Sequence, residues 1–106
     1  MKILVQLSNM FKNTTIKVDY DNNKLFVNDK ISELDAKTFA ARLISLTYLW
    51  PEKLINNDIN DGESYSIKIK NNGVLTEKIG VNKFPDNYIL FKALINEVTN
   101  VRAKNT

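Results

Sequence analysis

The side chains best suited to chemistry in this sequence are three lysines in its second half. Lys68 and Lys70 alternate with isoleucines in one run of residues, and Lys78 belongs to the run that follows. Such alternation places polar residues on the outward face of a strand, where lysine ammonium groups bind phosphates as point charges. Lys68, Lys70 and Lys78 are therefore candidates for a β-ribbon that contacts a nucleic acid or another acidic partner.

A solvated strand face is the alternative interpretation of these lysines. Lysine on an edge strand discourages pairing between molecules, and Glu77 lowers the positive charge of the ribbon. The net charge of +3 arises from fifteen basic and twelve acidic residues that are scattered along the chain. A charge this small does not predict nucleic-acid binding by itself, so both interpretations stay open.

Tyr48 is a second candidate contact, in this case for a protein partner. Tyrosine is enriched among the residues that dominate binding energy at protein interfaces. Tyr48 lies off the apolar stripe of the helix predicted around it, so we expect an exposed ring that could anchor a partner. Trp50 continues that stripe and is expected in the core.

Catalytic and metal chemistry finds little support in the sequence. The chain has neither cysteine nor histidine, which removes thiolate nucleophiles, thiolate zinc sites and the commonest general base. Asp58, Asp61 and Glu63 lie close together, but aligning Gly62 with the glycine of a calcium loop puts Ile59 at a ligand position. We predict a protein that is not an enzyme and has no cofactor and no metal.

Alternating apolar residues predict the strands that position these side chains. The predicted strands cover residues 2–7, 15–20, 24–28, 65–70 and 74–79. In the second hairpin, a three-residue loop over 71–73 pairs Ile69 with Leu75 and keeps apolar residues opposite one another. A two-residue loop would pair Ile69 with Thr76 and mix apolar with polar side chains, so we favour the longer loop.

A stripe of apolar residues at helical spacing predicts a helix after the third strand. It begins at Ser32 or Asp35, since either side chain could accept from the free N–H groups of the first turn. It ends before Pro51. Residues 52–63 then form a connection with turns and a short helical piece around residues 54–55.

A second stripe over residues 87–99 predicts the last helix, with Asp86 as its cap and Asn87 pointing away from the core. The predicted fold is α+β in the order β-β-β-α-β-β-α, an antiparallel sheet of about five strands with two helices on one face. A chain of 106 residues is long enough for one core. We therefore predict a single domain over residues 1–106, whose tail from residue 100 could fray.

The composition also bears on where the protein works. No run approaches the roughly 18 apolar residues of a membrane helix, and the run at residues 3–5 is too short for a signal peptide. With the absence of cysteine, this predicts a cytoplasmic protein without membrane contact. Frequent asparagine, lysine and isoleucine indicate an AT-rich genome, such as that of a low-GC bacterium, a phage or a plasmid.

Three segments in the second half of the chain carry a recognisable pattern. They are Trp50, residues 61–69 and residues 80–88, which read W, DGxxYxIxI and GxNxFPxNY. The pattern resembles small uncharacterised α+β proteins of low-GC Gram-positive bacteria and their mobile elements. The resemblance implies an architecture, with Pro85 and Asp86 in a strand-to-helix turn, and no shared activity.

Two functional hypotheses follow from the sequence. The first is a small non-enzymatic binding protein, an inhibitor or immunity-type protein encoded on a mobile element that acts on one protein target. The alternative is a DNA-binding accessory or regulatory protein that lays the Lys68/Lys70/Lys78 ribbon on phosphates as a wing.

Overall fold

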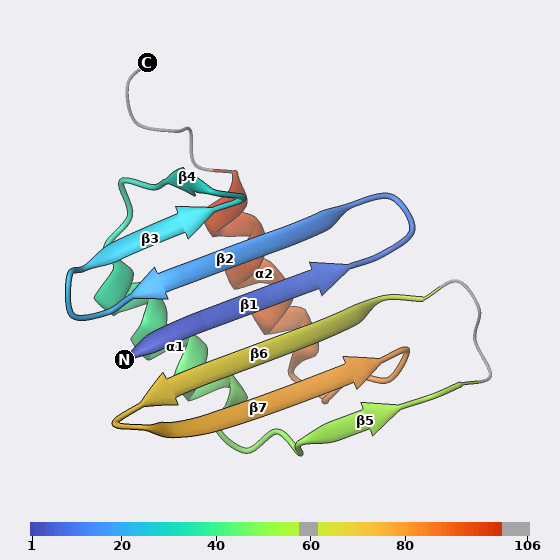
Figure 1. Cartoon of the computed structure of the whole chain (residues 1–106). Coiled ribbons are helices and arrows are strands. Elements are labelled where there is room, and N and C mark those ends of the chain that lie inside the picture. The colour runs from blue at the N-terminus through green and yellow to red at the C-terminus, as the bar shows by residue number, and fades with distance from the viewer. Residues whose placement is uncertain (58–61, 101–106) are drawn as a thin grey trace.

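The computed structural model describes residues 1–57 and 62–100. In these residues two helices cover one face of a seven-stranded sheet (Figure 1). The predicted α+β class is confirmed, but the sheet has more strands than the five expected and is mixed rather than wholly antiparallel. No helix within these two ranges is long and apolar enough to cross a membrane.

The sheet is built around the N-terminal strand. Its strands are β1 (Lys2–Ser8), β2 (Asn13–Asp19), β3 (Lys24–Val27), β4 (Lys30–Ile31), β5 (Lys53–Ile55), β6 (Ser64–Asn71) and β7 (Val74–Val81). Their order across the sheet is β4-β3-β2-β1-β6-β7-β5. β5 runs parallel to β7, and the other neighbouring strands are antiparallel.

The core lies between the sheet and the helices. Strand side chains point alternately to the two faces, and the apolar members of each pattern share the helix side. Those from the strands are Ile3, Val5, Leu7, Ile16, Val18, Leu25, Tyr65 and Ile67. Gly80 is required beside Tyr65, because a Cβ at residue 80 would lie 1.9 Å from the tyrosine ring.

Helix α1 (Ala36–Thr47) begins where one of the two predicted caps lies. The Asp35 carboxylate accepts from the N–H of Thr38 at 3.0 Å. Trp50 follows the helix and is buried, with its ring centroid 5.1 Å from those of Tyr65 and Phe91. The expectation that Trp50 belongs to the core is confirmed.

Helix α2 (Tyr88–Thr99) begins differently from the prediction. Its N-cap is Asn87 rather than Asp86, and no side chain caps its first turn. The Asn87 side chain accepts from the Trp50 indole N–H at 2.6 Å and donates to the Leu46 carbonyl oxygen at 2.7 Å. The prediction that Asn87 points away from the core is therefore wrong, because its amide joins a buried indole to a carbonyl group near the end of α1.

The connection over residues 52–63 contains β5 where a short helical piece was predicted. The Ile79 N–H donates to the Glu52 carbonyl oxygen at 2.9 Å, and the Asn56 N–H donates to that of Val81 at 2.8 Å. A strand of three residues is too short to show the alternation that distinguishes strand from helix.

The turn between β6 and β7 has two residues, not three. Asn72 and Gly73 have φ values of 51° and 79°, which is the conformation that Asn-Gly adopts in tight hairpins. The resulting register pairs Ile67 with Lys78. The predicted three-residue loop is wrong because Asn72 and Gly73 form the turn by themselves, and because Lys78, opposite Ile67, bonds to the carbonyl oxygens of Thr47 and Tyr48.

Candidate functional site

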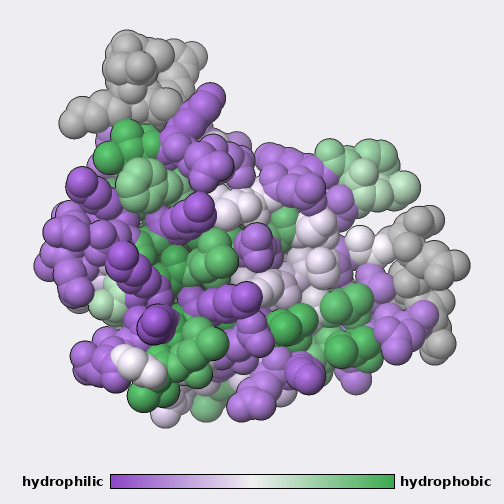
Figure 2. All heavy atoms as spheres, in the orientation of Figure 1, coloured by the Kyte–Doolittle hydropathy of each residue, from purple (hydrophilic) through white to green (hydrophobic). Residues whose placement is uncertain are grey.

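The side of the sheet that faces away from α1 and α2 is called the open face. Figure 2 views this face and shows hydrophobic side chains among hydrophilic ones. Cross-strand pairing divides it in two. The basic half includes Lys2, Leu4, Lys17, Asp19, Lys24, Phe26, Lys68, Lys70, Leu75 and Glu77. The hydroxyl half includes Gln6, Ser8, Asn13, Thr15, Ser64 and Ser66, beside the apolar Ile79 and Val81 of β7.

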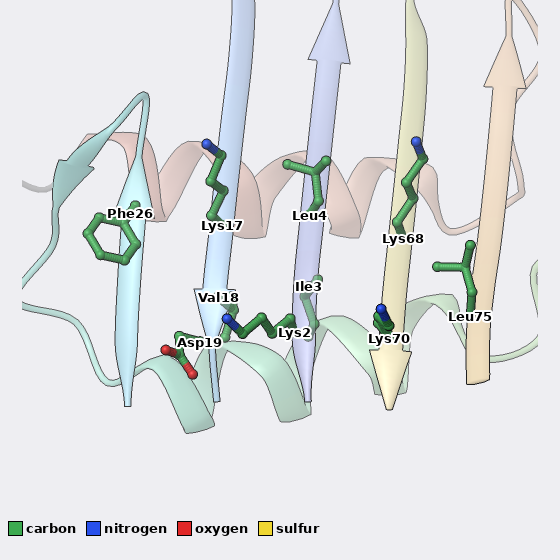
Figure 3. A pocket seen from close by; sticks show the side chains of 10 residues that line it. All are labelled: Lys2, Ile3, Leu4, Lys17, Val18, Asp19, Phe26, Lys68, Lys70 and Leu75. Atoms are coloured by element: carbon green, nitrogen blue, oxygen red, sulfur yellow. The ribbon is translucent and has the colours of Figure 1, made fainter. Parts of the chain in front are cut away.

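One row of the basic half holds an apolar side chain between two cations. Leu4 on β1 lies opposite Lys17 on β2 and opposite Lys68 on β6. Phe26 extends the row beyond Lys17. Neighbouring strands lie about 4.8 Å apart, so the two lysine backbones are about 10 Å apart. Figure 3 shows Leu4 between them.

The next row places two like charges side by side. Lys2 lies directly opposite Lys70, and Leu75 continues the row on β7. Like charges that face each other across strands destabilise a sheet. Within residues 1–57 and 62–100, neither ammonium group makes a salt bridge. An anion bound over this row would relieve their repulsion.

Asp19 is the carboxylate beside Lys2 in the same row. The hydrogen bond from Asn22 Nδ2, 2.8 Å long, is the main cause that lowers the pKa of Asp19, and the charges of Lys2 and Lys24 act in the same direction. Asp19 therefore stays charged near neutral pH and offsets part of the charge on Lys2.

The ion pairs on this face are weak. Lys17 lies 3.4 Å from Asp29, and Lys68 lies 3.5 Å from Glu77, with all four side chains at least 40% exposed. Exposed pairs contribute about 0 to 1 kcal/mol. A partner's carboxylates could replace these contacts at little cost.

A shallow hollow of about 380 Å³ lies over the basic half. It is lined by four lysines and one carboxylate, together with Leu4, Phe26 and Leu75. This arrangement can hold an acidic ligand against an apolar centre.

Lys78 does not belong with the other two lysines of the predicted ribbon. The two-residue turn directs its side chain to the helix side, where it is 9% exposed. Its ammonium group donates to the carbonyl oxygens of Thr47 at 2.5 Å and of Tyr48 at 2.9 Å. Burial lowers the pKa of Lys78. Its role is to satisfy the C-terminal end of α1.

Tyr48 is exposed, as predicted, but it lies apart from the basic half. It follows α1 and has 72% of its surface exposed. It lines a different hollow, together with Val74, Thr76 and Lys78 at the helix side of β7. The predicted anchor and the predicted lysine contact therefore do not form one site.

Most members of the basic half were not among the predicted site residues. Lys2, Leu4 and Lys17 alternate with core residues of their strands, so their outward direction was readable from the sequence. Their proximity to Lys68 depends on the pairing of β1 with β6, which no local pattern specifies.

Metal binding gains no support from the described residues. Within residues 1–57 and 62–100, no group of three acidic, cysteine or histidine side chains could hold an ion. Asp58 and Asp61, which were weighed as calcium ligands, lie outside the described residues.

Comparison of the chain with protein-family models, with curated proteins and with solved structures gives no match. The function is therefore inferred from the residues of the chain itself.

Proposed function

We propose that this protein is a non-enzymatic binding protein whose basic half holds an acidic segment of a protein partner. The observation that supports this function is the row in which Leu4 lies between Lys17 and Lys68. A partner that presents an apolar side chain among carboxylates would be complementary to it. The apolar neighbours Phe26 and Leu75 enlarge the centre of the contact.

The chemistry of the face favours a protein over a single-stranded nucleic acid. Nucleic-acid platforms stack bases on several aromatic rings and often use arginine. Among the described residues of the open face, Phe26 is the one aromatic side chain, and the cations are lysines. Aliphatic Leu4 and Leu75 suit the apolar centre of a protein interface, with charged groups at its rim.

The role that fits a small binding protein of this composition is that of an inhibitor or immunity-type protein encoded on a mobile element. The lack of cysteine and histidine in its sequence supports a stoichiometric binder rather than an enzyme. Its positive net charge argues against mimicry of DNA, which requires an acidic surface.

The test is a titration of labelled acidic peptide, in which glutamates flank leucines, at low and moderate salt. We expect the double variant Lys17→Glu/Lys68→Glu to bind about tenfold more weakly. Lys30→Glu/Lys37→Glu is the matched control, because it changes the net charge equally on the helix side of the sheet: Lys30 pairs with Val27, and Lys37 is an exposed residue of α1. Equal losses in both variants would mean that only net charge matters.

Nucleic acid is the second candidate, because Lys2, Lys17, Lys68 and Lys70 share one face. Duplex and single-stranded DNA are titrated alongside the peptide. Binding to phosphates predicts a steep loss of affinity with salt and no effect of Leu4→Ser. Binding to a protein segment predicts that Leu4→Ser weakens the complex, since an apolar contact is lost.

A further inference from the structure

The outer edge of β7 is only partly covered. β5 pairs with Ile79, Gly80 and Val81. In the described part of the chain, the five residues Val74–Lys78 have no strand partner on that side. Figure 1 shows β7 extending well beyond β5 toward the hairpin turn.

The backbone groups at this edge point outward at alternate residues. In an antiparallel pair, every second residue bonds to the neighbouring strand, and the residues between them point away. The Ile79 N–H points away from β6, because it donates to Glu52 on the other side. By the same alternation, the N–H and C=O groups of Leu75 and Glu77 point to the uncovered edge.

Exposed apolar side chains surround this edge. Val74 and Leu75, at 67% and 60% exposure, point to opposite faces of the sheet. Tyr48 and Leu49 are also exposed after α1, and Tyr48 lines a hollow of about 590 Å³ with Val74. Natural proteins protect such edges with charged side chains that point toward the inside of the protein. Among Val74–Lys78, Lys78 is a side chain of this kind.

We infer that the uncovered edge of β7 binds an extended segment of another protein as an added strand. Backbone donors and acceptors in a row recognise an extended chain, and side chains at alternate positions provide selectivity. The segment carries aliphatic residues, one beside Leu75 on the open face and the next toward Val74 and Tyr48. β5 already pairs with the same edge further along, so the added strand would continue its line.

This inference goes beyond the proposed function, since its contacts are backbone groups and aliphatic side chains rather than lysines. A second copy of the chain is a poorer occupant. Five paired residues span about 17 Å, and this pairing alone buries less than the roughly 1,200 Å² of a stable interface. An extended segment does not need an interface of that size, because strand addition gains its affinity from main-chain hydrogen bonds and its selectivity from alternate side chains.

Amide hydrogen exchange of the free protein is the first test. We expect the amides of Leu75 and Glu77 to exchange quickly, and those of Thr76 and Lys78 to be protected by their bonds to β6. Protection of Leu75 and Glu77 that persists on dilution would show that the edge is already covered. Protection that dilution removes would identify a second copy as the occupant, and would also overturn the inference.

The second test titrates a capped peptide of alternating valine and isoleucine, with lysines at its ends, and follows the Leu75 and Glu77 amide signals. Glu77→Pro removes an outward N–H while leaving the β6 ladder intact, and Glu77→Ala keeps that N–H. We expect the proline variant to bind about fivefold more weakly than the alanine variant, the ratio for one hydrogen bond.

A peptide methylated at every backbone nitrogen tests the same contact without changing the protein, because methylation at alternate nitrogens would leave one edge of the peptide free to pair. We expect it not to shift the Leu75 and Glu77 signals. Equal binding of the methylated and unmethylated peptides would overturn the inference, even if Glu77→Pro does not fold. Lys17→Glu/Lys68→Glu should leave this binding unchanged, which separates it from the proposed function.

Discussion

The two faces of one sheet use lysine in opposite ways. On the helix side, Lys78 is 9% exposed, and its ammonium group bonds to two carbonyl oxygens at the end of α1. On the open face, the side chain of Lys68 is 44% exposed and makes one long ion pair. The two residues occupy neighbouring strands of one hairpin. Which face a lysine points to therefore decides whether it stabilises the fold or stays available for a partner.

The largest expected effect is at Lys78. Replacing it with alanine leaves two carbonyl groups without their charged donor and opens space beside α1. We expect Lys78→Ala to lower the free energy of unfolding by about 2 to 3 kcal/mol, measured by urea denaturation. Lys68→Ala is the matched control, with an expected change within about 0.5 kcal/mol. Similar losses in both variants would remove the contrast between the faces.

The ion pairs show the same contrast. Glu63 accepts from Lys92 Nζ at 2.6 Å and from the Tyr88 hydroxyl at 2.5 Å. Burial raises the pKa of Glu63, but the hydrogen bonds from Lys92 and Tyr88 outweigh it and hold the pKa below its ordinary value of 4.5. The pair between Lys68 and Glu77 on the open face spans 3.5 Å and is more exposed.

This difference predicts a pH dependence of the unfolding free energy. Because the folded protein lowers the pKa of Glu63, its stabilisation is complete above about pH 4.5 and is lost as the pH falls through the folded-state pKa. We expect Glu63→Gln to be less stable than the wild type at pH 7. The gap should narrow in acid, and a gap that is constant with pH would contradict the assignment.

The sequence predicted the features of the fold that depend on neighbouring residues better than those that depend on contacts between distant segments. Local periodicity located both described helices and the five longer strands, and it placed Trp50 inside and Tyr48 outside. The register of the second hairpin was missed because a lysine opposite Ile67 looked unfavourable. A lysine can bury its aliphatic stem and bring its ammonium group to a polar partner. The local sequence around Lys78 does not show that carbonyl groups at the end of α1 provide this partner.

The candidate site was only half predictable for a related reason. Lys68 and Lys70 follow from alternation within one strand, but the basic half also needs β1 between β2 and β6. That pairing joins segments far apart in the chain, and it is set by packing of the whole core rather than by local propensity.

The smallest expected effect on stability has the opposite sign. Lys70 lies opposite Lys2, with Leu75 on its other side, so Lys70→Glu replaces a repulsive pair with an attractive one. We expect the unfolding free energy to rise by about 0.2 to 1 kcal/mol, while affinity for the acidic peptide falls. Lys70→Gln should give a smaller change in both. A gain in stability with a loss of binding would mean that the open face retains a repulsive pair because a partner's charge relieves it. A loss of both would place Lys70 with Lys78 among the lysines that hold the fold.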